Sequence, residues 1–375
     1  MDKQSEMRYS LRSESGNKTV PAFFDGIAKA IEQAHTQIGR AVNLTICMTY
    51  YEVGRLIVEQ EQDGATRAPY GTKLLSELSG YLTERCGKGW SVGNLKNARQ
   101  FYAVYSPSIR QSVISESANR DSPLDFFKLS WTHYLVLMRI QKACVRHFYE
   151  IESVNQQWTV RQLKRQIDSS LYERLSLSRN RDEVLRLSRE GQTVEKSQDM
   201  VKSPLVLEFL GLEQKPAYSE SDLESAIIAN LQRFLLELGK GFLFEARQKR
   251  FAFDEKSFFV DLVFYNRLLQ CYVLIDLKTG ELRHQDLGQM LMYVHYFDRH
   301  VKQAFEKPTV GILLCQEKNN NIVELTLPED SNIYASEYSL YLPDKNLLQH
   351  KLAEWTAEFE EAHAGTPNDF QKPCC

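Results

Sequence analysis

The sequence predicts two domains of different fold class, a mainly α-helical N-terminal domain and a mixed α/β C-terminal domain. The 375 residues exceed the usual length of one domain, and 43% of hydrophobic residues suffice for two cores. Apolar residues recur at helical spacing in the first half, whereas strand-like runs begin only in the second. We therefore expect a helical domain over 21–175, a polar linker over 176–205 and an α/β domain over 206–355.

The two ends of the chain differ from these domains. Residues 1–20 are rich in Ser, Lys and Glu and lack apolar periodicity, which predicts a disordered arm. Residues 356–375 are expected to form a charged tail.

The N-terminal domain should be built from amphipathic helices. Apolar side chains recur every three or four positions between residues 22 and 62, which predicts one long helix or two. These side chains include Ile27, Ile31, Ala34, Ile38, Val42, Val53 and Ile57. A later helix should begin after Thr159, which has capping-box spacing with Gln162.

Two further helices, 72–85 and 92–105, are separated by a Gly-containing break and form a helix-turn-helix candidate. On the second helix, Lys96 and Arg99 are long basic side chains able to reach the phosphates or base edges of DNA. A solvated helical hairpin would show the same pattern, so both interpretations stay open.

The C-terminal domain is expected to have the element order αβββαβ, with a mixed sheet flanked by helices. The predicted helices are 222–238 and 285–300, and the predicted strands are 242–253, 258–265, 271–277 and 309–315. Further strand-like runs follow at 322–327 and 333–342.

Composition excludes several other classes of protein. The formal net charge of −3 argues against a generally basic nucleic-acid binder, so any such contact must be local. The seven cysteines form no CxxC pair and no zinc-like group with the eight histidines, which favours a reducing cytoplasm. No apolar signal segment and no run of about 18 apolar residues occurs, so we expect a soluble protein without membrane contact.

Two aspartates interrupt strands that are otherwise apolar, Asp261 in FFVDLVFY and Asp276 in CYVLIDLK. If residues 267–270 form a hairpin loop, Tyr265 pairs with Tyr272 and the two aspartates face each other, with Cβ atoms about 5 Å apart. Facing carboxylates in half-buried strands repel each other unless a cation lies between them. Oxygen-only ligands favour Mg²⁺ or Mn²⁺.

Lys278 is predicted to share a strand face with Asp276, because the two residues are two positions apart. An ammonium group there would stabilise the charge that develops on a phosphate during hydrolysis. A single strand-end lysine is more often only solvated, so the spacing D…(D/E)xK across the hairpin is what points to chemistry.

Other polar side chains are candidates for the same site. Gln289 and Tyr293 are four apart on one helix face, where they could orient a water or a phosphate, and a half-exposed helix face explains them equally well. Glu224 shares a stripe with core-facing apolar residues, but Ser221 and Glu224 also have capping-box spacing. Both explanations of Glu224 stay open.

Three basic residues on the first strand are candidates for contact with a nucleic-acid backbone. Arg247 and Lys249 are expected to share a face, with Arg250 adjacent. Charges that protect an exposed strand edge would give the same pattern.

The residues named above, together with the runs around them, resemble the YhcG-type proteins of the PD-(D/E)XK nuclease superfamily. The C-terminal likeness rests on EARQKRF (245–251), VDLVFYNR (260–267), VLIDLKTG (273–280), GQMLMY (288–293) and PTVGILLC (308–315). The N-terminal likeness rests on YEVGRLI (51–57), NLKNARQFY (94–102), LSWTHY (129–134) and WTVRQLKRQI (158–167).

The resemblance implies a Mg²⁺- or Mn²⁺-dependent nuclease in which Asp261 and Asp276 bind the metal and Lys278 is the catalytic lysine. Two positions depart from the usual motif: Val260 stands in place of proline, and Asp276 in place of a more common glutamate.

By the same resemblance, Gln289 and Tyr293 would match a QxxxY motif, and Glu224 would match the acid of the first core helix. The N-terminal domain would resemble a winged-helix-like module, which implies DNA contact through residues 92–105.

Two functions agree with these observations. The first is hydrolysis of phosphodiester bonds in DNA, and the second is a non-catalytic nucleic-acid binding or assembly protein that retains a nuclease fold. RNA is an alternative substrate. A homo-oligomer is compatible with either function.

Overall fold

The structure is a computed structural model, and it describes residues 19–63, 68–115, 126–177, 181–212, 218–253, 255–328 and 331–350. The chain divides into two compact units, residues 1–135 and 136–375, which are described separately. Most of the predicted arm, residues 1–18, lies outside the described residues, as does the predicted tail over 356–375. The domain limits expected from the sequence stay a prediction.

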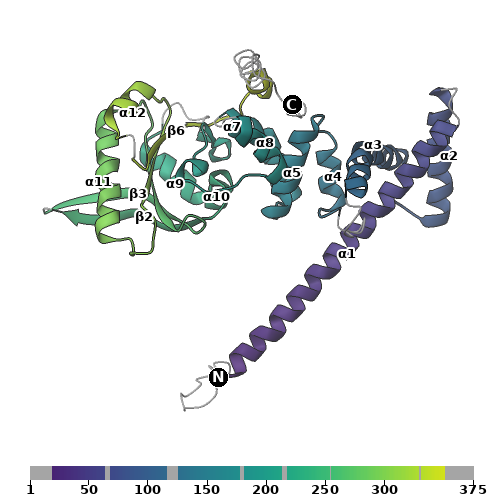
Figure 1. Cartoon of the computed structure of the whole chain (residues 1–375), viewed down its shortest axis with the longest axis horizontal. Coiled ribbons are helices and arrows are strands. Elements are labelled where there is room, and N and C mark those ends of the chain that lie inside the picture. The colour runs from purple at the N-terminus through teal and green to yellow at the C-terminus, as the bar shows by residue number, and fades with distance from the viewer. Residues whose placement is uncertain are drawn as a thin grey trace, which may run out of the picture. The chain divides into compact units, whose positions relative to one another are not determined.

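The described elements of the first unit are all helices (Figure 1). They are α1 (Thr19–Asp63), α2 (Ala68–Cys86), α3 (Val92–Ser115) and the start of α4 (Trp131–Leu137). The apolar spacing between residues 22 and 62 therefore belongs to one helix rather than two. Gly54 of α1 lies against α3 so closely that a Cβ there would be 2.1 Å from the Ala98 oxygen. A wing would need strands, and the described residues of this unit contain none.

Four short helices open the second unit: α5 (Ala143–Asn155), α6 (Val160–Asp168), α7 (Leu171–Leu177) and α8 (Arg181–Glu190). The predicted capping box before α6 is confirmed. The Thr159 side chain accepts from the Gln162 N–H, and the Gln162 side chain accepts from the Thr159 N–H at 2.8 Å. Within the segment where the sequence predicts a linker, the structure has α8 and the 3-10 helix η2 (Ser197–Met200).

The remainder of the second unit contains a six-stranded mixed sheet with the order β1-β6-β5-β4-β3-β2. The strands are β1 (Leu205–Val206), β2 (Phe242–Phe253), β3 (Lys256–Asn266), β4 (Cys271–Leu277), β5 (Val310–Cys315) and β6 (Ile333–Ser339). Strands β2, β3 and β4 are antiparallel neighbours, whereas β5, β6 and β1 continue parallel to β4. The expected mixed sheet with the order αβββαβ is confirmed.

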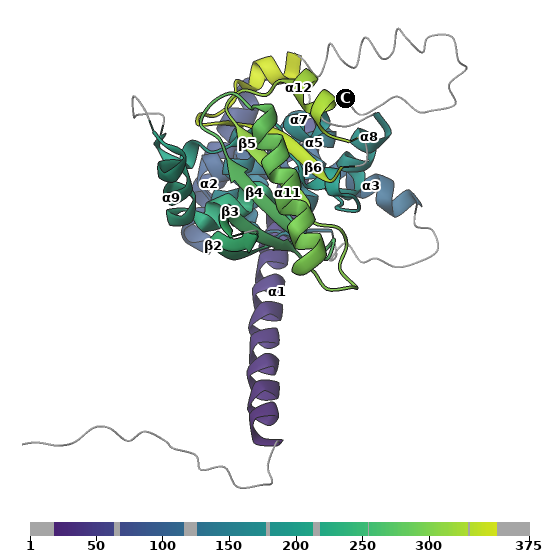
Figure 2. The ribbon, with the colours of Figure 1, turned by 90° about the vertical axis from the view of Figure 1, so that its left-hand side faces the viewer.

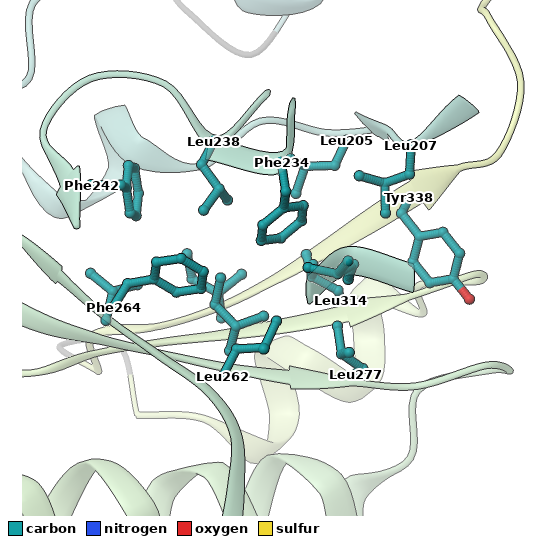
Figure 3. Close-up of a cluster of buried hydrophobic side chains, with 14 of the residues drawn as sticks. Leu205, Leu207, Phe234, Leu238, Phe242, Leu262, Phe264, Leu277, Leu314 and Tyr338 are labelled. Carbon is teal, nitrogen blue, oxygen red and sulfur yellow. The ribbon is translucent and has the colours of Figure 1, made fainter. Parts of the chain in front are cut away.

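Helices cover both faces of this sheet. Helices α9 (Glu220–Ala229) and α10 (Leu231–Leu238) pack on one face, where Phe234 and Phe264 belong to a continuous apolar core (Figure 3). Helix α11 (His284–His300) crosses the other face (Figure 2) and packs with a second core. Because β4 and β5 are covered on both sides, their sequences are nearly continuous apolar runs. A carboxylate in β4 is therefore placed among buried side chains.

Two local predictions are wrong. The helix expected over 222–238 begins at Glu220 and breaks at Asn230 into α9 and α10. The strand expected at 322–327 is helix α12 (Asn320–Thr326). The Asn319 side chain accepts from the Ile322 N–H and so caps its first turn, which favours a helix over a strand in so short an apolar run.

A buried ionic cluster joins α6 and α7 to α10 within the second unit. Arg174 and Glu237 are completely buried and form an ion pair at 2.6 Å, and Arg165 contacts the other Glu237 oxygen at 3.0 Å. Lys202 donates to the Glu237 carbonyl at 2.5 Å. Burial alone would raise the pKa of Glu237, but Arg174, Lys202 and Arg165 hold it at about 2. The carboxylate is therefore charged inside the protein.

Candidate active site

Asp261 and Asp276 lie on neighbouring strands, and the predicted register is confirmed. Tyr265 pairs with Tyr272 and Leu262 pairs with Ile275, so the next positions along the two strands are the two aspartates. The Asp261 carboxylate accepts a hydrogen bond from the Leu277 N–H at 2.9 Å. The side chain of Asp261 thus occupies the place where backbone pairing between β3 and β4 stops.

The two strands separate directly after the aspartates. Strand β3 extends back to Lys256 with β2 beside it, whereas the Lys278 N–H donates to Leu314 O at 2.7 Å, in line with β5. The aspartates therefore lie at a fork between β3 and β4. A fork leaves room beside the carboxylates that a continuous ladder would fill.

Asp276 is the most perturbed acid of the fork. It is 3% exposed, and its Oδ2 receives no hydrogen bond of regular geometry from the described residues, although Lys278 Nζ lies 2.8 Å away. Burial and the neighbouring Asp261 charge raise the pKa of Asp276 to about 7, against the opposing effect of Lys278. A buried carboxylate with unused lone pairs is a ligand that lacks its cation.

Lys278 lies between two acids. Its Nζ is 2.8 Å from Asp276 and 3.7 Å from Glu220 at the start of α9. Burial alone would lower the pKa of Lys278, but Asp276 and Glu220 raise it above its usual value. Lys278 is therefore an ammonium group at neutral pH. It can offset negative charge or donate hydrogen bonds, but it cannot remove a proton from water.

Glu224 points into the same region and does not cap its helix. Helix α9 is capped by Ser219, whose side chain accepts from the Asp222 N–H, so the suggested Ser221–Glu224 capping pair is wrong. Glu224 is 4% exposed, and its carboxylate accepts from Arg247 and from Gln248.

Gln248 is a site residue that the sequence did not reveal. Its Nε2 donates to Glu224 and also to Asp261 Oδ1 at 2.9 Å, so it joins the acid of α9 to the acid of β3. The backbone of Gln248 has a φ of 48°, which is unusual for a non-glycine residue in a strand. Nothing in the run EARQKRF distinguishes this glutamine from a solvent-facing one.

Gln289 and Tyr293 contact each other on α11, as their spacing suggested. Gln289 Nε2 donates to Tyr293 Oη, and the Tyr293 ring packs edge-on against Phe251. Burial raises the pKa of Tyr293, Gln289 opposes this effect, and the charges of Asp276 and Asp261 raise it further. The phenol is therefore close enough to the two acids to sense them, and it stays protonated.

The basic residues of β2 do not act as one group. Arg247 donates to Glu224 on the α9 face, whereas Lys249 lies over the Phe297 ring of α11, 5.9 Å from its centroid. The expectation that these two residues share a face is wrong, because the register shift in β2 and the positive φ of Gln248 interrupt the alternation. Arg250 is exposed and donates to Ser257 Oγ at 3.0 Å.

The two candidates in the first unit differ in their contacts. Lys96 of α3 is exposed. Arg99 forms an ion pair at 2.9 Å with Glu61 of α1, so part of its charge is already matched within the unit.

A divalent metal fits the fork through two carboxylates. Among the described residues, no group of three or more His, Cys, Asp or Glu side chains is placed to hold a metal, so Glu224 does not join Asp261 and Asp276 as a third ligand. Mg²⁺ commonly takes only one or two protein carboxylates and completes its shell with water and substrate phosphate. The buried, incompletely bonded Asp276 Oδ2 agrees with that kind of site.

Comparison with known proteins places this geometry in a family. Residues 198–353 match the model of the YhcG PDDEXK nuclease domain, and residues 26–174 match that of the DUF1016 N-terminal domain. The chain is 38% identical over 358 residues to a protein of Escherichia coli (strain K12) that bears the name "Putative nuclease YhcG". The match covers 90% of this chain and 95% of the relative. The chain belongs to the YhcG family.

The YhcG family domain at 198–353 contains the whole sheet and every acidic residue of the fork. Solved structures that resemble the chain include a repair endonuclease from Pyrococcus abyssi, with 20% identity over 34% of this chain and a TM-score of 0.23. Another is an EndoMS–dsDNA2 complex, with 19% identity over 35% of this chain and a TM-score of 0.25. The chain spans about half the length of these proteins, 50% and 48% respectively.

No helix among the described residues has the length and apolar character needed to cross a membrane. The five cysteines that the structure describes are free thiols, and four of them are buried.

Proposed function

We propose that this YhcG-family chain is a nuclease that hydrolyses phosphodiester bonds in DNA and depends on Mg²⁺ or Mn²⁺. The observation that supports this proposal best is the facing pair Asp261 and Asp276 at the β3–β4 fork, with Lys278 beside it. Nothing else in the described residues combines buried acids, a raised carboxyl pKa and an adjacent ammonium group.

Each residue has a chemical role in this proposal. Asp261 and Asp276 would hold the cation, which when bound supplies Lewis-acid stabilisation of the phosphate oxygens and favours ionisation of water. Lys278 is already protonated and would offset the negative charge that develops on the phosphate. Glu224 and Gln248 would keep Asp261 in position through the hydrogen bond from Gln248 Nε2.

The direct test incubates the purified chain with linear, branched and single-stranded DNA, and with RNA, in the presence of Mg²⁺ or Mn²⁺. We expect wild type to cleave DNA and Asp261→Ala not to cleave it. DNA binding that survives EDTA, without cleavage under any metal, would instead identify a non-catalytic binding protein.

Removing the side chain of Gln248 is expected to weaken metal binding. Because Gln248 has a positive φ, Gln248→Gly removes the amide without backbone strain. Loss of this outer contact should lower Mn²⁺ affinity by about 10–100-fold, as measured by titration calorimetry.

Gln270→Gly is the matched control for Gln248→Gly. Gln270 is also a glutamine with a positive φ, 56°, but it lies in the β3–β4 turn away from the acids. Equal Mn²⁺ affinity in the two variants would show that Gln248 does not position the site.

The β2–β3 hairpin beyond the fork is proposed to contact the DNA backbone. Arg250 and Lys256 are both exposed there, on the part of the hairpin that extends past Asp261. The double variant Arg250→Ala/Lys256→Ala should bind DNA more weakly and lower the salt dependence of binding by about two phosphate contacts.

This DNA contact is measured by fluorescence anisotropy over a salt series in EDTA, so that cleavage does not interfere. Arg267→Ala is the control, because Arg267 is exposed in the turn at the opposite end of the same hairpin. A loss of affinity that is the same for Arg267→Ala would contradict a specific role of the extended part.

A further inference from the structure

Helix α1 has two parts with different environments. From Cys47 onward it belongs to the core of the first unit, where Cys47 is fully buried and Ile57 is 4% exposed. From residue 23 to residue 42 every residue is exposed. Figures 1 and 2 show this N-terminal part of α1 without another element of its unit beside it.

The exposed part carries large apolar side chains, which we call the apolar stripe. Its seven members have exposed fractions between 39% and 63%: Phe23, Phe24, Ile27, Ile31, Ile38, Val42 and Ile46. From Phe24 to Ile46 the intervals are three, four, seven, four and four residues, which keeps these side chains on one side of a helix. Ala34 fills the interval of seven.

The charged residues of the same segment lie away from the apolar stripe. At about 100° per residue, the four charges fall on the opposite side of the helix and sum to zero: Asp25, Lys29, Glu32 and Arg40. A neutral polar side disfavours nucleic acid or an anionic membrane surface as the partner, since both need a cationic face. It presents no electrostatic barrier to a second helix of the same kind.

This segment is a poor helix when it stands alone. Isolated helices are marginal in water, and Gly26 and Gly39 weaken this one further. Neither glycine is required by packing, because nothing lies within 4 Å of a Cβ built at either position. The described residues offer no contact that holds residues 23–42 helical, so a partner along the apolar stripe is the missing stabilisation.

We propose that the apolar stripe pairs with the apolar stripe of a second copy of this chain, as a helix–helix dimer. If each of the seven side chains offers about 100 Å² of accessible surface, two copies would bury about 1,400 Å², the size of a standard stable interface. Left open, the stripe would exceed the largest apolar patch usual on a monomer, about 300–600 Å². This dimer is independent of the proposed nuclease function.

The test compares the mass of full-length variants in solution by light scattering and sedimentation. Wild type is expected to have about twice the mass of one 43.5 kDa chain and to dissociate on dilution. Ile31→Lys/Ile38→Lys places two charges in the apolar stripe and should give a monomer at every concentration tested. Gln33→Lys/Thr36→Lys adds the same charges on the opposite side of α1 and should remain a dimer.

A second measurement separates dimer loss from unfolding. On dilution of wild type, the far-ultraviolet helical signal should fall together with the dimer fraction, while the melting transition of the rest of the protein persists. A monomeric wild type at about 100 μM, or equal dimerisation of the two double variants, would overturn the proposal. A stable mass larger than two chains would overturn it as well.

Discussion

Asp276→Asn is expected to reduce DNA cleavage by about 10³-fold without destabilising the metal-free protein. The variant removes one of the two carboxylates of the fork, so Mn²⁺ affinity should fall with activity. The folded state should not suffer, because Asp276 is buried with a pKa raised to about 7. An amide of the same shape avoids the cost of burying that charge.

This prediction is checked with cleavage rates, Mn²⁺ titration and urea unfolding of the same preparation. Glu245→Gln is the control, because Glu245 is an exposed acid on β2 that contacts Lys249. An Asp276→Asn variant that cleaves DNA at the wild-type rate would contradict the role of Asp276. A variant that unfolds without metal would show that the carboxylate is structural.

The largest effect on stability is expected from Glu237→Gln. This change leaves Arg174, which is completely buried, without its anionic partner, and should lower the free energy of unfolding by about 3–5 kcal/mol. Urea denaturation measures the loss. Glu208→Gln is the matched control, because Glu208 pairs with Arg165 at 3.1 Å but is 20% exposed, and it should cost about 1 kcal/mol or less.

The difference between wild type and Glu237→Gln should also depend on pH. The folded-state pKa of Glu237 is lowered from 4.5 to about 2, so its stabilising effect is complete above pH 4.5 and disappears as the pH falls toward 2. The two unfolding curves should therefore approach each other below about pH 4. A constant difference between pH 6 and pH 3 would contradict this account.

Much of the fold could be predicted because it depends on local patterns. The αβββαβ order follows from apolar periodicity, and the register of Asp261 against Asp276 follows from a four-residue loop and a side-chain period of two. Helix α1 follows from apolar spacing alone. These features are set by residues that are near one another in the chain.

The errors occurred where distant residues compete with local preference. The break at Asn230 and helix α12 replaced an expected continuous helix and an expected strand, in segments too short for periodicity to decide. The positions of Arg247 and Gln248 depend on Glu224, which is more than twenty residues earlier in the chain.

The sequence by itself determined the class of the C-terminal domain, the facing aspartates and the lysine two positions after Asp276. Only the tertiary structure decided that Glu224 is held by Arg247 and Gln248 rather than joined to the two aspartates, and that Arg174 and Glu237 form a buried pair. The physical reason is that strand alternation is a local property, whereas the burial and hydrogen bonding of a charge depend on which distant element covers it.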